Sequence, residues 1–261
     1  MRRASVWSWL WVLLGGIYFL LPLYATLSFS LKAKRGVLSL LAYENVLADA
    51  RFFKTFTFSL EMALLTIVVG VLLVVPTAYW VHLRLPRLRP VIELITLLPF
   101  VIPAIVLVFG LIRTYYGLGI ALFTETPVML VAGYVVLSLP YMYRAVDTGL
   151  RAMDVRTLTE AAQSLGASWP TILFRIILPN LRVALLSGAF LTVAIVIGEF
   201  TLASLLAWPA FGPYMALLGQ DRAYEPAALA IMSFGLTWAA MGLIQWLGSG
   251  RGGQQNLTGA H

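Results

Sequence analysis

Six long apolar stretches constrain the fold of this chain more than any other feature of its sequence. A helix needs about 20 mostly apolar residues to cross the hydrocarbon core of a membrane. Hydrophobic residues make up 61% of the chain, and charged residues only 11%. We therefore predict an all-α, polytopic membrane protein with six transmembrane helices. The predicted spans are approximately 7–29, 55–81, 91–112, 127–142, 183–207 and 226–247.

The same pattern sets the predicted domain limits. Residues 1–247 are expected to form one transmembrane domain, and residues 248–261, which are rich in Gly, Gln and Asn, a flexible carboxy-terminal tail. The charged start Met1-Arg2-Arg3 is typical of a signal peptide. The apolar run after it is too long for one, and no cleavage site between small residues follows. We expect a retained membrane anchor.

The distribution of basic residues predicts the orientation. With the amino terminus inside, most of the 18 Lys and Arg residues fall on the inner side, as the positive-inside rule requires. Both termini are therefore expected in the cytoplasm, with the chain crossing the membrane several times. The net charge of +7 follows from this rule. No basic cluster with interleaved aromatic residues stands apart from an apolar stretch, so nucleic acid is not an expected partner.

The longest inner loop, about residues 143–182, has the pattern of a helical element. Thr157 with Glu160 three residues later fits a capping box at a helix start. Gly166 suits the position after a helix end, where the backbone becomes left-handed. The sequence therefore predicts a short helix that ends at a glycine corner.

A second short helix is predicted after this corner. Ser168 can cap its start, with Pro170 in its first turn. Pro179 is expected to end it, because proline lacks an amide hydrogen and clashes with the preceding turn. By its physics alone, this loop fits an amphipathic element on lipid headgroups as well as one presented to a soluble partner.

The residues of this loop resemble the EAA loop of permease subunits of bacterial ABC importers. They read Glu160-Ala161-Ala162, Gly166-Ala167 and Ile176-Ile177-Leu178-Pro179. Six spans with this loop between the fourth and fifth is also the arrangement of that family's core. Pro99 to Pro103 in the third span looks like a helix signature of the spermidine/putrescine branch. Gly198-Glu199-Phe200 recurs in several branches and does not assign a cargo.

The resemblance implies a multi-pass permease subunit of the bacterial inner membrane that forms half of a translocation pathway. Its partners would be a dimer of cytoplasmic ATPase subunits, a second homologous and non-identical permease, and an extracytoplasmic solute-binding protein. ATP and Mg²⁺ would be bound by the ATPase. Polyamine is the leading cargo, with ferric iron, thiamine and aminophosphonate left open. The loop residues expected to couple to the ATPase are Glu160, Ala161, Ala162, Gly166, Ala167, Leu178 and Pro179.

No feature of the sequence indicates enzyme chemistry, a metal site or a cofactor in this chain. It has no Gly-rich phosphate-binding loop and no cysteine. His82 and His261 are too far apart for a paired metal motif, and His82 is expected at the membrane interface. An ATP-independent channel or an ion-coupled carrier is the alternative, although those more often show intramembrane charges or internal repeats. A structural or enzyme subunit would leave the loop pattern unexplained.

Candidate pathway residues are the charged and helix-bending side chains of the spans. A carboxylate in hydrocarbon is costly, so it usually faces the bundle interior or a water path. Glu199, placed near the middle of the fifth span, either contacts cationic cargo or bonds a neighbouring helix, and Glu61 is the second candidate. Glu93 is expected at the interface. Pro99 and Pro103 are expected to act as hinges or as static kinks.

Overall fold

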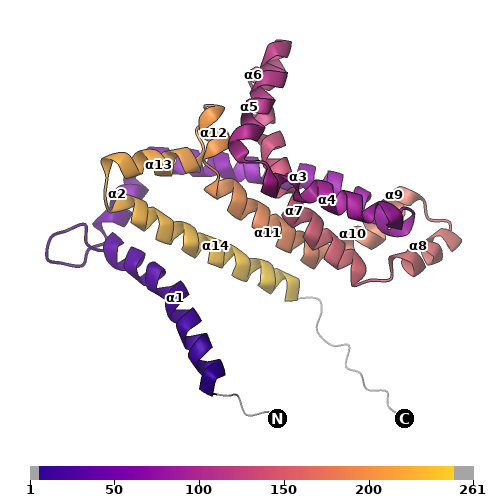
Figure 1. Ribbon diagram of the computed structural model, residues 1–261, viewed down its shortest axis with the longest axis horizontal. Coiled ribbons are helices and arrows are strands. Elements are labelled where there is room, and N and C mark those ends of the chain that lie inside the picture. Colours follow the sequence, from indigo (N-terminus) through magenta and orange to yellow (C-terminus); the bar gives the residue numbers. More distant parts are fainter. Residues whose placement is uncertain (1–5, 250–261) are drawn as a thin grey trace. The chain divides into compact units, whose positions relative to one another are not determined.

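The computed structural model describes residues 6–249, and every regular element in that range is helical (Figure 1). The pairing of Lys34 with Val37 is an isolated bridge and forms no strand. The all-α prediction is therefore confirmed. The last helix ends at Ser249, so residues 250–261 of the predicted tail lie outside the described range.

The helices follow one another closely along the chain. The first seven are α1 (Val6–Ser30), α2 (Leu41–Ala48), α3 (Ala50–Leu83), α4 (Arg89–Val101), α5 (Ala104–Tyr115), α6 (Ala121–Thr124) and α7 (Val128–Arg151). The remaining α-helices are α8 (Val155–Ser164), α9 (Trp169–Ile172), α10 (Leu178–Asn180), α11 (Arg182–Gly198), α12 (Thr201–Leu205), α13 (Phe211–Asp221) and α14 (Glu225–Ser249). Single-turn 3₁₀ helices cover Pro86–Leu88 and Tyr116–Leu118, and a π-helix covers Leu173–Ile177.

Three helices are long and apolar enough to cross a membrane by themselves. They are Trp9–Ser30, Ala50–Leu83 and Val128–Arg151. Two further pairs pass the same test together, but they are bent by 99° between Val101 and Ala104 and by 75° between Asn180 and Arg182. The described residues thus contain up to five spans, and the predicted count of six is not confirmed. The sixth predicted stretch lies on α14.

The third predicted span is broken, which corrects the expectation of one continuous helix. α4 ends at Val101, and α5 starts after Pro103, whose backbone is extended. Proline at this position has no amide hydrogen to continue the helical ladder. Pro99 lies inside α4, and Pro140 lies inside α7 without ending it.

The fifth predicted span is also shorter than expected. α11 ends at Gly198, and Glu199 follows it with an extended backbone. Glu199 is therefore one residue past the end of α11, and the expectation of one continuous fifth helix that contains it is corrected. The chain turns here and enters the five-residue helix α12.

The described residues divide into two compact units, of which the smaller comprises 6–54 and 213–239. Its polar side chains bond one another. Ser30 and Tyr43 share a hydrogen bond of 2.7 Å between their hydroxyl oxygens, and Asn45 donates to Glu225 at 2.9 Å. Asp49 accepts a bond from Arg51 at 2.9 Å.

The larger unit comprises 55–212 and 240–249, and its core lies where α3, α7 and α11 meet. One apolar cluster joins α3 and α7 to the loop between α7 and α11, and a second joins the other ends of these helices to α5 and α12. Gly188 of α11 lies against Met142 of α7, where a Cβ atom would be 2.9 Å from the sulfur. A glycine is needed here because the two helices approach closely.

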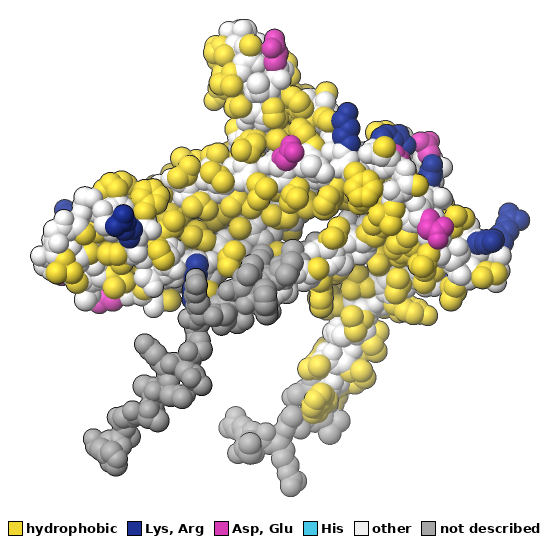
Figure 2. Space-filling model, turned by 180° about the vertical axis from the view of Figure 1, so that it is seen from behind, with side chains coloured by type: hydrophobic (Ala, Val, Ile, Leu, Met, Phe, Trp, Pro, Cys, Tyr) yellow, Lys and Arg dark blue, Asp and Glu magenta, His cyan; other side chains and the backbone are white. Residues whose placement is uncertain are grey.

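Large apolar side chains cover much of the remaining surface. Figure 2 shows hydrophobic side chains over long stretches of the visible face, with Lys and Arg side chains confined to a few places. A water-soluble chain rarely exposes apolar patches of this size. The exposed apolar surface is that of a protein surrounded by lipid.

Candidate functional site

The first helix of the loop between α7 and α11, α8, starts one turn earlier than the sequence pattern predicted. Asp154 is its N-cap, and its carboxylate accepts bonds from the backbone N–H of Thr157 at 3.0 Å and from the Thr157 hydroxyl at 2.7 Å. These bonds hold the pKa of Asp154 below its usual range. The predicted capping box of Thr157 with Glu160 is wrong, because an aspartate three residues upstream satisfies the free amides instead.

The glycine corner at the end of α8 is confirmed. Gly166 has φ +80°, in the left-handed region that glycine enters without a steric penalty. The N–H of Gly166 donates to the Gln163 carbonyl at 2.9 Å, and that of Ala167 donates to Ala162 at 3.0 Å. These two bonds form the Schellman arrangement that satisfies the last carbonyls of a helix.

The second helix of the loop begins directly after Ser168, the predicted N-cap position, but the Ser168 hydroxyl bonds the Thr171 hydroxyl at 3.0 Å and caps no backbone amide. The helix also does not end at Pro179. α9 is followed without a gap by the π-helix Leu173–Ile177 and by α10, which contains Pro179. In the wider π turn the backbone N–H of Leu178 donates to the Leu173 carbonyl, five residues earlier. This shifts the register of the helical hydrogen bonds just before Pro179. The chain bends only after Asn180, so the predicted stop at Pro179 is corrected.

One face of α8 packs against the bundle. Val155, Thr159 and Ala162 are buried, and Ala162 belongs to the same apolar cluster as Tyr79 of α3. The hydroxyl groups of Tyr79 and Thr159 lie 3.0 Å apart in a buried contact. Small and polar residues on this face let the helix lie close to α3.

The opposite face of α8 is open. Glu160 and Ala161 are exposed, and Glu160 accepts a bond from Arg156 one turn earlier at 2.8 Å. The side chain of Leu165 is 88% exposed, beside the exposed Gly166. Of the other predicted coupling residues, Ala162 is buried, Ala167 and Leu178 are half-buried, and Pro179 is exposed.

The second helix of the loop is held to α3 by aromatic packing. The indole rings of Trp169 and Trp80 stack with centroids 5.8 Å apart and an interplanar angle of 21°. Ile172 and Ile177 are fully buried in the cluster that contains Tyr79. The two loop helices are thus fixed to one end of α3 by a hydrogen bond, a ring stack and apolar packing.

An ion network that the sequence analysis did not predict lies at the same end of the bundle. The Asp147 carboxylate of α7 is 9% exposed and accepts bonds from His82 at 2.8 Å and from Arg89 at 3.0 and 3.1 Å. Arg151 donates to the same carboxylate at 2.8 Å. The network joins α3, the start of α4 and α7.

Glu93 completes this network. It accepts bonds from Arg89 and Arg151, each at 3.2 Å. His82 is 14% exposed and paired with Asp147, so its predicted role as an interfacial side chain is replaced by a contact between helices. The spacing of Asp147 and Arg151, one helical turn apart, was the available signal.

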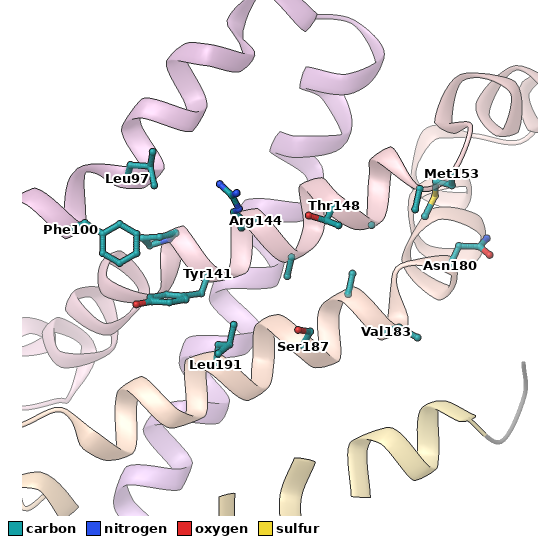
Figure 3. A pocket seen from close by; sticks show the side chains of 15 residues that line it. Leu97, Phe100, Tyr141, Arg144, Thr148, Met153, Asn180, Val183, Ser187 and Leu191 are labelled. Carbon is teal, nitrogen blue, oxygen red and sulfur yellow. The ribbon is translucent and has the colours of Figure 1, made fainter. Parts of the chain in front are cut away.

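A cavity of about 920 Å³ opens between α4, α7 and α11 (Figure 3). Its wall is mostly apolar, with Leu97 and Phe100 from α4 and Leu191 from α11. Among the described residues that line it, Arg144 of α7 is the only charged one, and none is a carboxylate. The sequence analysis did not select Arg144.

Glu199 makes local contacts outside this cavity. Its carboxylate accepts bonds from the backbone N–H groups of Thr201 at 2.7 Å and of Leu202 at 3.0 Å. These bonds cap the start of α12. They match the structural role considered for Glu199 more closely than a contact with cargo.

The remaining pathway candidates do not meet at one site. Glu61 lies on the exposed side of α3, Pro99 lies inside α4, and Pro103 lies at the break between α4 and α5. Phe100, next to Pro99, lines the cavity. Its ring meets the ring of Tyr141 edge-on, with the ring centroids 5.5 Å apart. The structure therefore brings Phe100, the neighbour of Pro99, to the cavity, and it brings neither Glu61 nor Glu199 there.

Comparison with known proteins gives a consistent result. A family described as "binding-protein-dependent transport system inner membrane component" matches residues 75–252. A probable molybdenum ABC transporter permease of Haloferax volcanii is 31% identical, covering 94% of this chain and 92% of its own. The spermidine/putrescine permease PotB of Escherichia coli is 27% identical over 61% of this chain and 63% of its own.

Solved structures share the fold. An ABC transporter for alginate import matches with a TM-score of 0.65 and 15% identity over 91% of this chain and 92% of its own. An amino acid ABC transporter matches with a TM-score of 0.52 and 19% identity over 80% of this chain and 95% of its own.

Proposed function

The chain belongs to the family of binding-protein-dependent transport system inner membrane components, and we infer that it imports an oxyanion of the molybdate class. As an ABC importer permease it is a transport protein of the membrane. Beyond this membership we propose the cargo, the contacts with partner proteins and the direction in which the chain crosses the membrane.

The similarity to a molybdenum permease over 94% of the chain carries the proposed cargo. A molybdenum transport permease of Azotobacter vinelandii is also 30% identical, over 54% of this chain and 67% of its own. The polyamine branch favoured by the sequence analysis is not confirmed, because its relatives are less similar and cover about three fifths of the chain.

The geometry of the cavity supports an anion. A cationic polyamine needs carboxylates along its path, and the described residues that line this cavity include none. Both carboxylate oxygens of Glu199 already accept bonds from backbone amides, so the side chain is engaged within this chain. A divalent oxyanion instead fits this larger cavity, where the one charged group among the described lining residues is positive.

We assign the exposed side of the α8 corner to the ATPase contact. Leu165 is an exposed apolar side chain beside Gly166 and close to Glu160 and Ala161, and such a group gains from burial in a partner cleft. ATP and Mg²⁺ would be bound by a dimer of ATPase subunits. Their closure would pull on α8 and α9 and, through Tyr79, Thr159 and Trp169, on α3.

The other partners follow from the same assignment. A solute-binding protein would deliver the oxyanion from outside, and a second permease subunit would complete the pathway. Contact between α8 and a cytoplasmic ATPase would require this loop to lie inside. With the six spans predicted from the sequence, both termini would then lie inside as well.

Transport by the purified complex tests the proposal. The chain would be purified with its co-purifying ATPase and binding protein, reconstituted into vesicles, and supplied with labelled molybdate or labelled spermidine. We expect ATP-dependent uptake of molybdate and none of spermidine. Uptake of spermidine without molybdate would overturn the cargo assignment, and uptake without any ATPase would overturn the importer mechanism.

A further inference from the structure

We propose that Arg144 is the anion-contacting residue of the translocation cavity and that Thr148 and Ser187 complete its site. This inference rests on the proposed oxyanion cargo and names the groups that meet it. Figure 3 shows Arg144 and Thr148 on α7 and Ser187 on α11, all lining the same cavity.

The charge of Arg144 is unusual for its position. It lies within the membrane-spanning helix Val128–Arg151, where an arginine is costly unless it faces a water-filled path or an opposite charge. Within residues 6–249 its guanidinium has no ion pair or hydrogen bond, and it is exposed to the cavity. An unpaired guanidinium that faces a cavity within the membrane can bind an anion that passes through it.

The neighbouring ion network explains why Arg144 stays free. Asp147 and Glu93 are the nearest carboxylates along α7 and α4, and both accept bonds from Arg89 and Arg151. Two acids are thus matched by two arginines, with His82 as a further partner of Asp147. No carboxylate of the network remains to neutralise Arg144.

A second cavity of about 340 Å³ adjoins the first around the same residue. It is lined by Glu93, Asp147 and Arg151, and it shares Arg144 and Thr148 with the larger cavity. Arg144 therefore lies where the apolar part of the path meets its ionic end. An anion that moves between the two passes its guanidinium.

The chemistry of the site fits a tetrahedral oxyanion. A guanidinium presents planar, paired N–H donors that match two oxygens at once. The hydroxyl of Thr148, one helical turn from Arg144, and that of Ser187 form no hydrogen bond within the described part of the chain. One cation and two hydroxyls bind an oxyanion loosely enough for it to leave, as a transport path requires.

The first test measures transport by the reconstituted complex of permease, ATPase and binding protein. Loss of a charged hydrogen bond corresponds to about a ten- to hundredfold change, so Arg144→Gln should slow molybdate uptake at least about tenfold. ATP hydrolysed per molybdate imported should rise, because docking and the motor are unaffected. Arg144→Lys should recover much of the rate. Arg87→Gln, which removes an exposed arginine outside both cavities, should behave as the unchanged chain.

Three outcomes separate the hypotheses. If the unchanged complex imports spermidine and not molybdate, the proposed cargo is wrong and this site falls with it. If it imports molybdate and Arg144→Gln does so equally well, only the site is wrong. If Arg144→Gln lowers ATP hydrolysis and melting temperature together with uptake, Arg144 has a structural role and the site is also wrong.

The second test uses the absence of cysteine from the sequence. Thr148→Cys places one thiol beside Arg144, and its modification can be followed by the mass of this chain. We expect an anionic thiosulfonate to react faster than a cationic one, and molybdate to slow the anionic reaction. Arg144→Gln should remove this preference. Equal rates for the two reagents with Arg144 in place would contradict the proposal.

Discussion

The Tyr79 hydroxyl of α3 donates a buried hydrogen bond of 3.0 Å to the hydroxyl oxygen of Thr159 on α8, eighty residues further along the chain. The direction follows from the second bond of Thr159, whose single hydrogen is donated to the Val155 carbonyl at 2.7 Å. This contact ties the loop that we assign to the ATPase directly to a membrane-spanning helix.

Removing one partner of this bond should destabilise the folded chain more than removing the other. Thr159→Val leaves the Tyr79 hydroxyl buried without a partner, which costs about 1–3 kcal/mol, whereas Tyr79→Phe removes the donor and costs about 0.5–1.5 kcal/mol. Thermal unfolding of the purified complex measures the difference. Equal destabilisation by the two variants would indicate that the bond is absent in the complex.

The substitutions tolerated at Gly166 should be limited by its backbone conformation and not by a lack of space for a side chain within this chain. A Cβ at this position meets no atom within 4 Å, but φ is +80°, and a left-handed backbone costs an ordinary residue about 1–2 kcal/mol. Gly166→Asn should therefore be tolerated better than Gly166→Val. ATP hydrolysis stimulated by the binding protein measures coupling. If Asn and Val impair it equally while both chains insert and assemble, the partner surface excludes any side chain.

Asp147→Asn should destabilise the bundle because it leaves Arg89 and Arg151 close together with one acid between them. We expect a loss of about 1–3 kcal/mol, the range for leaving a buried polar or charged group unsatisfied. Glu160→Gln removes a carboxylate from an exposed pair one helical turn apart and is the matched control, with no measurable change in melting temperature. A stable Asp147→Asn protein would show that the network does not hold α4 to α7.

Glu199→Gln should lower stability without changing cargo. The amide keeps one acceptor but loses a second for the backbone N–H groups of Thr201 and Leu202, so the start of α12 is less well capped. Melting temperature and the ratio of molybdate to spermidine uptake measure the two effects. An altered ratio with an unchanged melting temperature would place Glu199 in the pathway.

The cap of α8 should depend on pH. The pKa of Asp154 is lowered in the folded chain by its bonds from Thr157. Its contribution is therefore fully present above the ordinary value of 3.8 and is lost as pH falls through the lower folded value. Hydrogen exchange of the first turn of α8, compared between the unchanged chain and Asp154→Ala, should differ at neutral pH and converge in strong acid. A difference that persists there would show that the carboxylate charge is not involved.

Local sequence patterns predicted the parts of the site that depend on neighbouring residues. The glycine corner at Gly166 was predictable because a left-handed residue after a helix is a local requirement. The capping residue was misplaced from Asp154 to Thr157 because both residue types suit a helix start and the choice depends on where the preceding helix ends. Pro179 was misjudged because a π turn absorbs it.

The amino-acid sequence by itself determined the all-helical membrane class, the position of the inner loop and the family resemblance, since hydropathy and turn residues act within a few positions. Only the tertiary structure decided that Asp147 pairs with Arg89, 58 residues away, and that Arg144 finds no ion pair among residues 6–249. Such contacts depend on the rotation of each helix and on the 99° and 75° bends in two of the spans. Those quantities are set by packing across the whole bundle, so no local pattern contains them.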